Sequence, residues 1–214
     1  MNFTDTLLAI SAKTFGRPEL DTTGKILLPE TLLDRIMKSN FNQQVMYFLL
    51  RNPRSQQQIA AGIESFTSDR ASAVIPSWMM QYIDISENDK VQVSLQNFPT
   101  ATSVTFQPFS SEFYDLPNFR VILEYTLRQM PCLTQGAVVP VPFNNKIYKI
   151  KVLKVEPKMM VSCLHADLTT DVAQPLDTFD HHWGEEEENY EPAFIREKKA
   201  AGNPAFRGKP HSLK

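Results

Sequence analysis

The chain has 214 residues, of which 42% are hydrophobic and 21% charged, and its formal net charge is −2. Such values are those of a globular protein with an ordinary core, and they argue against a nucleic-acid-binding protein, which usually has a strong basic excess. No apolar run approaches the length that crosses a bilayer, so no membrane insertion is expected. Residues 1–13 also lack a basic segment followed by a continuous apolar one, which predicts a location in the cytoplasm and nucleus.

The first organised feature in chain order is a strand that leads through a proline into a helix. Residues 7–15 alternate weakly and predict a strand, and a polar connection follows. In ILLPETLLDRI, residues 26–36, an apolar run meets Pro29 and is followed by apolar residues at helical spacing. Proline lacks an N–H and has a helical φ, so it fits the first turn of a helix. We therefore expect strand to give way to helix at Pro29.

The same unit occurs a second time, in AVIPSWMMQYI, residues 73–83, where Pro76 takes the place of Pro29. Apolar runs at residues 45–50 and 59–66 predict strands between the two copies. A polar turn and two alternating strands follow the second copy; these strands are predicted at residues 91–95 and 102–109. Two copies predict a pseudo-twofold architecture. Residues 1–112 are therefore expected to form a closed barrel, mostly strand with two short helices.

The character of the chain changes after this barrel. Apolar residues at helical spacing predict one long amphipathic helix at residues 116–130. Strands are then predicted at residues 137–143, 147–155 and 159–167. A helix followed by a small antiparallel sheet describes a second, α+β subdomain over residues 113–178. From residue 179 to 214 no apolar periodicity remains, and an acidic run precedes a basic stretch, so a disordered tail is expected.

Several motifs, in order, carry a resemblance to a known family. They are GKILLPETLLDRI, AVIPSWMMQYIDISENDKVQV, FQPFSSEFYDL, VILEYTLRQMPCLTQGAVV and NNKIYKIKVLKVEP. Together they resemble the N-terminal region of the ubiquitin fusion degradation protein family, over residues 7–179. The resemblance implies a fold that is mainly β with α+β: a double-psi β-barrel, then a small α/β-roll subdomain.

The resemblance also implies a function and partners. It implies a non-enzymatic adaptor that binds ubiquitin and polyubiquitin chains and has no cofactor or metal. Such an adaptor pairs with a companion subunit and recruits ubiquitylated substrates to a valosin-containing-type AAA ATPase for extraction and proteasomal degradation. ER-associated degradation, at the ER surface, is one such setting. The ubiquitin contacts must be exposed apolar side chains, which the sequence does not separate from the core.

The tail contains a candidate docking motif for the ATPase. Residues 206–213, FRGKPHSL, resemble the motif Phe-x-Gly-x-Gly-x-x-Leu that such adaptors use. Phe206, Gly208 and Leu213 match, whereas Pro210 replaces the second glycine. Phe206 and Leu213 would be apolar anchors, and Gly208 would allow close approach of the backbone. The alternative is a chance match in a basic tail.

Other candidate residues favour structural roles. Cys132 and Cys163 lie in apolar stretches, outside any CxxC pair, and are expected to be buried free thiols. Trp78 stands at the start of the second helix, where core or subdomain-interface packing is expected. Lys149 and Lys151 are predicted to form the solvated face of an edge strand, open to a charged partner. His181 and His182 lack the ordered spacing of a metal site.

Two other classes of function remain as alternatives on a related barrel. A pyruvoyl-dependent enzyme of this fold would cleave itself at a Gly-Ser pair, and the chain has none. Residues 21–24 read Asp-Thr-Thr-Gly, one residue longer than the Asp-Thr-Gly motif of aspartic proteases, and the insertion would displace the carboxylate of Asp21. No second such motif is present, so a pair of catalytic carboxylates is not supported. A DNA-binding relative would need a basic surface, but the charges of the first strand and helix are nearly balanced.

Overall fold

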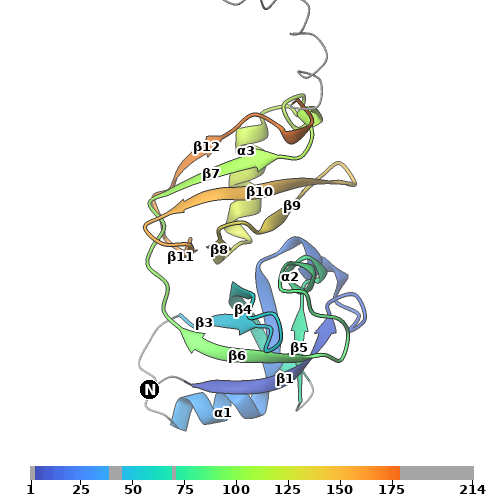
Figure 1. Ribbon diagram of the computed structural model, residues 1–214, viewed down its shortest axis with the longest axis vertical. Coiled ribbons are helices and arrows are strands. Elements are labelled where there is room, and N and C mark those ends of the chain that lie inside the picture. Colours follow the sequence, from blue (N-terminus) through green and yellow to red (C-terminus); the bar gives the residue numbers. More distant parts are fainter. Residues whose placement is uncertain (1–2, 39–44, 69–70, 179–214) are drawn as a thin grey trace, which may run out of the picture. The chain divides into compact units, whose positions relative to one another are not determined.

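A closed barrel of six strands forms the N-terminal part of the chain. The structure is a computed structural model, and it describes residues 3–38, 45–68 and 71–178. The barrel strands are β1 (Thr4–Ser11), β2 (Lys25–Pro29), β3 (Tyr47–Arg51), β4 (Gln58–Ser68), β5 (Ser72–Ile75) and β6 (Lys90–Gln96). They close in the order β1-β5-β2-β4-β3-β6. Figure 1 shows this barrel at the N-terminal end of the chain. Helices α1 (Glu30–Lys38) and α2 (Ser77–Tyr82) and the 3-10 helix η1 (Pro18–Thr22) lie in the connections.

The pairing of these strands confirms the predicted twofold duplication. When β1, β2 and β3 are exchanged for β4, β5 and β6, the set of strand pairs and their directions is unchanged. Thus β1 runs parallel to β5 as β4 does to β2, and β1 is antiparallel to β6 as β4 is to β3. The pairs β2–β5 and β3–β6 map onto themselves. The axis passes near the Leu27–Val74 pair, between the two repeated segments.

Both repeated segments change from strand to helix at their proline, one residue later than expected. Pro29 is the last residue of β2, and α1 begins at Glu30. Pro76 is the N-cap of α2, with ψ 136°, and the helix begins at Ser77. A proline is tolerated there because the N-cap N–H has no intrahelical partner either. The predicted apolar stripes are buried: Leu32 and Ile36 in α1, and Met79, Met80 and Ile83 in and just after α2.

The second subdomain packs one helix on a sheet. The helix is α3 (Phe119–Arg128). The 3-10 helix η2 (Ser111–Phe113) lies before it, and the 3-10 helix η3 (Leu176–Thr178) ends the subdomain. A four-stranded sheet has the order β12-β7-β10-β9, and its strands are β7 (Ser103–Pro108), β9 (Val138–Phe143), β10 (Lys146–Glu156) and β12 (Thr169–Val172). The strands β8 (Cys132–Thr134) and β11 (Met160–Ser162) form a separate pair. The helix and the sheet enclose their own core, around Phe106, Phe113 and Val152.

Three expectations about this subdomain are wrong. The strand at residues 102–109, assigned to the barrel of residues 1–112, is β7, which pairs with β10 and β12. The strand expected within residues 159–167 pairs with β8 instead of joining the main sheet. Lys149 and Lys151 lie on β10, which is an interior strand, so they belong to a sheet face rather than an edge. Alternation predicts a strand but does not specify its neighbour, which is why these pairings were misassigned.

Direct hydrogen bonds join the barrel to the second subdomain. The Gly24 N–H donates to the Gln129 carbonyl at 2.9 Å. The Ala60 N–H donates to the Thr134 hydroxyl at 3.0 Å, and the Ser162 hydroxyl donates to that of Tyr47 at 2.6 Å. The expected fold class, a β-barrel with an α+β subdomain, is confirmed. The tail expected at residues 179–214 lies outside the described residues, and no described helix has the length and apolar character to cross a membrane.

Candidate functional site

A predominantly apolar recess opens where α2 meets the β9–β10 hairpin. Its volume is about 460 Å³. Its lining comes from four separate segments: Asp21, Ser77, Trp78, Gln81, Tyr82, Phe109, Val138, Pro140, Ile147 and Lys149. Apolar clefts with a few polar groups are the usual form of a binding site. The recess is therefore the candidate site.

Helix α2 supplies the barrel side of the recess, and three hydrogen bonds to two other segments fix it. The Asp21 carboxylate accepts from the Ser77 N–H at 2.6 Å, so it caps the first turn that Pro76 leaves uncapped. The Trp78 indole N–H donates to the Thr23 carbonyl at 3.0 Å. The Tyr82 hydroxyl donates to the Gln135 carbonyl at 3.0 Å, across the subdomain boundary. Burial raises the pKa of Tyr82, which keeps this hydroxyl protonated as a donor.

Trp78 joins the two hydrophobic cores beneath the recess. The partly buried indole packs against the barrel core and against the core of the second subdomain. This confirms the expected packing at the subdomain interface. Trp78 therefore forms a rigid base for the site, because one end of its ring is hydrogen-bonded and its faces are packed.

Exposed apolar side chains form the opposite wall. Ile147 on β10 is 55% exposed and Phe109, just after β7, is 40% exposed. The Phe109 N–H donates to the Lys149 carbonyl at 3.1 Å, which holds Phe109 beside β10. Burial of these two side chains by a partner would be favourable, at about 25 cal/mol per Å² of apolar surface. The wall is therefore suited to an apolar partner surface.

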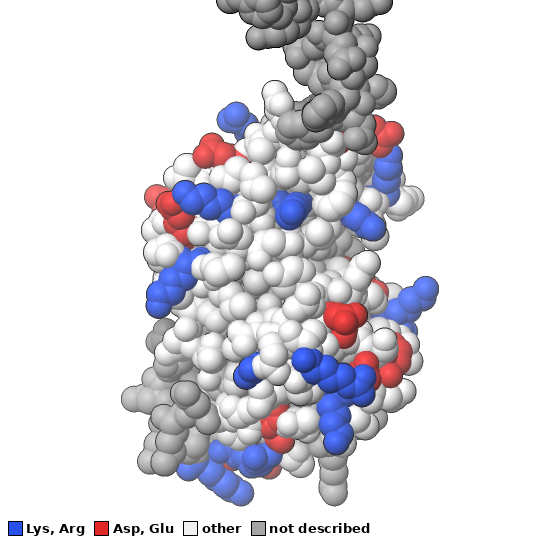
Figure 2. Space-filling model, viewed as in Figure 1, with Lys and Arg blue, Asp and Glu red and all other residues white. Residues whose placement is uncertain are grey.

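The charges on the surface do not favour a phosphate-binding site. Figure 2 shows basic and acidic side chains interspersed over one face of the molecule, with few of either sign across its middle. Within residues 3–38, 45–68 and 71–178, no three His, Cys, Asp or Glu side chains gather closely enough to hold a metal ion. The site offers apolar contact, a few hydrogen bonds and two charged side chains, Asp21 and Lys149.

The other sequence candidates have the following positions. Cys132 and Cys163 are free thiols, Cys132 buried and Cys163 partly buried. Burial raises the pKa of both, that of Cys163 to about 12, so neither is a reactive thiolate. Asp21 caps α2, a structural role. The docking residues Phe206, Gly208 and Leu213 and the pair His181 and His182 lie outside the described residues.

The sequence did not identify Phe109, Pro140 or Ile147 as site residues. One signal was present: Ile147 shares its β10 face with Lys149 and Lys151, so it is an apolar residue at the end of an outward, basic row. The remaining lining residues come together only through the packing of α2 on the hairpin. No local pattern in the sequence predicts the contact between α2 and the hairpin.

The comparison with known proteins agrees with this architecture. The family described as "Ubiquitin fusion degradation protein UFD1, N-terminal subdomain 1" matches residues 3–99, and "N-terminal subdomain 2" of the same protein matches residues 100–175. A human protein named "Ubiquitin recognition factor in ER-associated degradation protein 1" is 35% identical over 160 residues, 75% of this chain and 52% of the relative.

Two further relatives carry the family name itself. The "Ubiquitin fusion degradation protein 1 homolog" of Dictyostelium discoideum is 31% identical over 159 residues, 74% of this chain and 48% of the relative. The "Ubiquitin fusion degradation protein 1" of Saccharomyces cerevisiae is 29% identical over 156 residues, 72% of this chain and 43% of the relative. The chain spans about half the length of the curated relatives it matches.

The fold and the matched regions define the class: a duplicated six-stranded barrel followed by a helix-and-sheet subdomain, with an apolar recess between them. The chain belongs to the ubiquitin fusion degradation protein 1 family. The resemblance drawn from the motifs is thereby confirmed.

Proposed function

We propose that this chain is a non-enzymatic ubiquitin-binding adaptor in ubiquitin-dependent protein degradation, including ER-associated degradation. It carries polyubiquitylated substrates to a valosin-containing-type AAA ATPase, together with a companion adaptor subunit. Membership of the family over residues 3–175 supports this proposal, and so do the names of relatives described as ubiquitin recognition factors.

The observation that carries the proposal is the recess of Trp78, Phe109 and Ile147. Ubiquitin binding through apolar contact needs exposed apolar side chains on a rigid support, and this recess provides both. Other exposed apolar side chains in the described residues, such as Met37 on α1 and Met159, do not line it. The ubiquitin surface is therefore assigned to the recess.

ATPase docking is assigned to Phe206, Gly208 and Leu213. Its support is the motif resemblance alone, with Pro210 as a departure from the pattern. The two assigned surfaces lie in different parts of the chain, so separate substitutions can test them.

One pulldown experiment with two variants, each expected to lose a different interaction, tests both halves of the proposal. The full chain and its variants are incubated with polyubiquitin and with the isolated ATPase N-domain. Ile147→Asp should weaken ubiquitin binding at least about fivefold, the effect of losing a contact of about 1 kcal/mol, and leave ATPase binding intact. Phe206→Ala should have the reverse effect.

Met37→Asp is the matched control, because Met37 is 58% exposed and lies away from the recess. It should leave both interactions unchanged. Equal ubiquitin binding by the wild type and Ile147→Asp would refute the recess as the ubiquitin surface. Equal ATPase binding by the wild type and Phe206→Ala would refute the docking motif.

A further inference from the structure

The two edges of the four-stranded sheet differ in what they offer to another strand. The β9 edge carries Pro140 and Pro142, which have no N–H to donate. The β12 edge, residues 169–172, contains no proline, and Thr169, Thr170 and Asp171 are exposed. Proline is one means by which proteins block an edge, and β12 lacks it.

The outward backbone groups of β12 can be identified from its pairing with β7. The Thr169 N–H donates to the Thr102 carbonyl at 3.1 Å, and the Ala173 N–H donates to the Phe106 carbonyl at 2.7 Å. Since successive residues of a strand alternate in direction, the N–H groups of Thr170 and Val172 point away from β7. No strand of the described residues pairs with that side. At the C-terminal end, the Tyr114 hydroxyl donates to the Val172 and Ala173 carbonyls.

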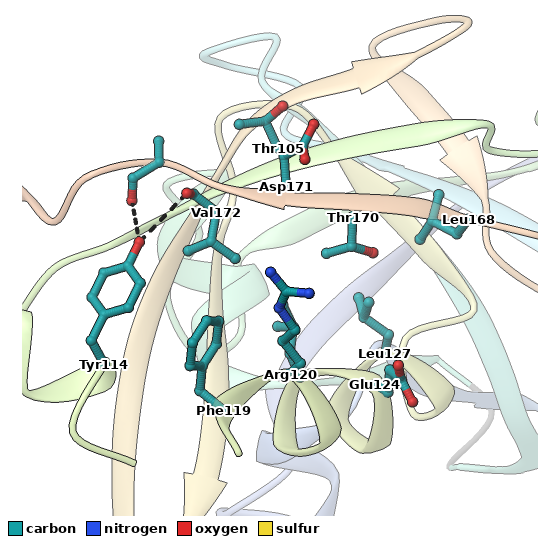
Figure 3. Close-up of a pocket in the computed structure, with 12 residues that line it drawn as sticks. Thr105, Tyr114, Phe119, Arg120, Glu124, Leu127, Leu168, Thr170, Asp171 and Val172 are labelled. Atoms are coloured by element: carbon teal, nitrogen blue, oxygen red, sulfur yellow. Dashed lines mark hydrogen bonds between the residues drawn. The ribbon is translucent and has the colours of Figure 1, made fainter. Parts of the chain in front are cut away.

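A groove of about 720 Å³ runs between this edge and α3. Figure 3 shows the groove, with α3 on one side and β12 on the other. Its lining mixes polar and apolar side chains, and the apolar ones are Phe119, Leu123 and Leu127 of α3, Val172 of β12 and Leu168 just before β12. A strand added to β12 would therefore have alternate side chains over an apolar floor, the arrangement by which sheet-edge recognition sites select their peptides.

The charges at the groove differ between the two faces of β12. Arg120 extends from α3 towards β12, and Asp171 lies on the opposite side of the strand (Figure 3). In the part of the chain that the structure describes, neither forms an ion pair within 4.0 Å. On its α3 face an added strand would meet Arg120 and, one helical turn further along, Glu124. On its other face it would meet the negative charge of Asp171. The groove therefore suits a peptide with alternating charge.

We propose that the outer edge of β12 binds an extended peptide segment of a partner protein by strand addition. A carboxylate of that peptide faces Arg120, apolar side chains two residues away on either side enter the groove, and neighbouring cationic side chains face Asp171. This surface is separate from the recess of Trp78 and does not depend on ubiquitin binding. It gives the chain a second docking site for a protein segment.

A designed peptide tests the proposal on the full chain. The probe is Ac-Thr-Val-Lys-Glu-Lys-Val-Thr-NH2, which places Val, Glu and Val on one face and both Lys on the other. In amide NMR titrations, the Thr170 and Val172 signals should shift saturably and become protected from hydrogen exchange. A charge-swapped peptide, with Glu and Lys exchanged, should bind at least about fivefold more weakly.

Two substitutions separate strand addition from nonspecific attraction. Arg120→Glu should reverse the preference between the two peptides. Thr170→Pro should abolish binding of both, because it removes an outward N–H, while Thr170→Val should bind like the wild type. Both Thr170 variants leave the inward bonds of Thr169 and Ala173 in place.

Three results would overturn the proposal. They are the absence of a saturable shift at Thr170 and Val172, equal affinity for both peptides, and a concentration-dependent dimer in which two β12 edges pair with each other. Sedimentation at increasing concentrations of the chain alone detects the dimer.

Discussion

Gly62 on β4 lies where the barrel touches the second subdomain, and its missing side chain makes the contact possible. A Cβ built on Gly62 would lie 2.6 Å from both Cβ and Cγ of Pro131. Glycine within a strand is unfavourable by itself, so its presence here has a packing reason. The proline ring is short and fixed to the backbone, so it cannot move aside as a flexible side chain would.

Gly62→Ala should therefore destabilise the protein by about 1–3 kcal/mol, the usual cost of overpacking. Urea unfolding of the variant and the wild type measures the difference. In a Pro131→Gly background Gly62→Ala should cost much less, since glycine removes both clashing ring atoms, Cβ and Cγ. An unchanged midpoint for Gly62→Ala would show that this contact gives way freely.

Among the individual elements, the loop after β1 is held by Glu87, which follows α2. The Ser11 N–H donates to both carboxylate oxygens at 3.1 Å, and the Thr14 hydroxyl donates to one at 2.8 Å. Partial burial raises the pKa of Glu87, but the hydrogen bonds from Ser11 and Thr14 outweigh it, so the pKa lies below its ordinary value. The ionised carboxylate thus ties two parts of the barrel together.

Glu87→Gln should lower the free energy of unfolding at pH 7, by less than about 1 kcal/mol because the group is largely solvated. A lowered folded pKa gives stability that is present above the unfolded value of about 4.3 and is lost as the pH falls through the folded pKa. The difference between the wild type and the variant should therefore shrink as the pH falls below about 4.3. Urea unfolding at pH 7 and at a series of acidic pH values checks this, and a constant difference would contradict it.

The elements predicted correctly from the sequence are those defined by local periodicity. The two strand-proline-helix segments and α3 were found because their apolar residues recur at helical spacing. β8 and β12 were missed because each is a strand of three or four residues, too short to show alternation. The partners of β7 and β11 were misassigned because pairing depends on packing that is distant in sequence.

For the molecule as a whole, the sequence predicted the two subdomains but not the recess between them. Trp78 was expected in the core or at the subdomain interface from its position beside Met79 and Met80, and it packs against both cores. Ile147 and Phe109 were read as ordinary strand residues, since their exposure results from how the hairpin packs against α2. A site that forms where two subdomains pack against each other leaves little trace in the sequence of either subdomain alone.

An NMR footprint of ubiquitin on the full chain shows whether this recess is the ubiquitin surface. The Trp78 indole N–H and the Ile147 methyl groups should shift together on titration, and the α1 signals around Met37 should stay unchanged. Saturable binding that leaves Trp78 and Ile147 unperturbed, or a footprint centred on α1, would contradict this assignment.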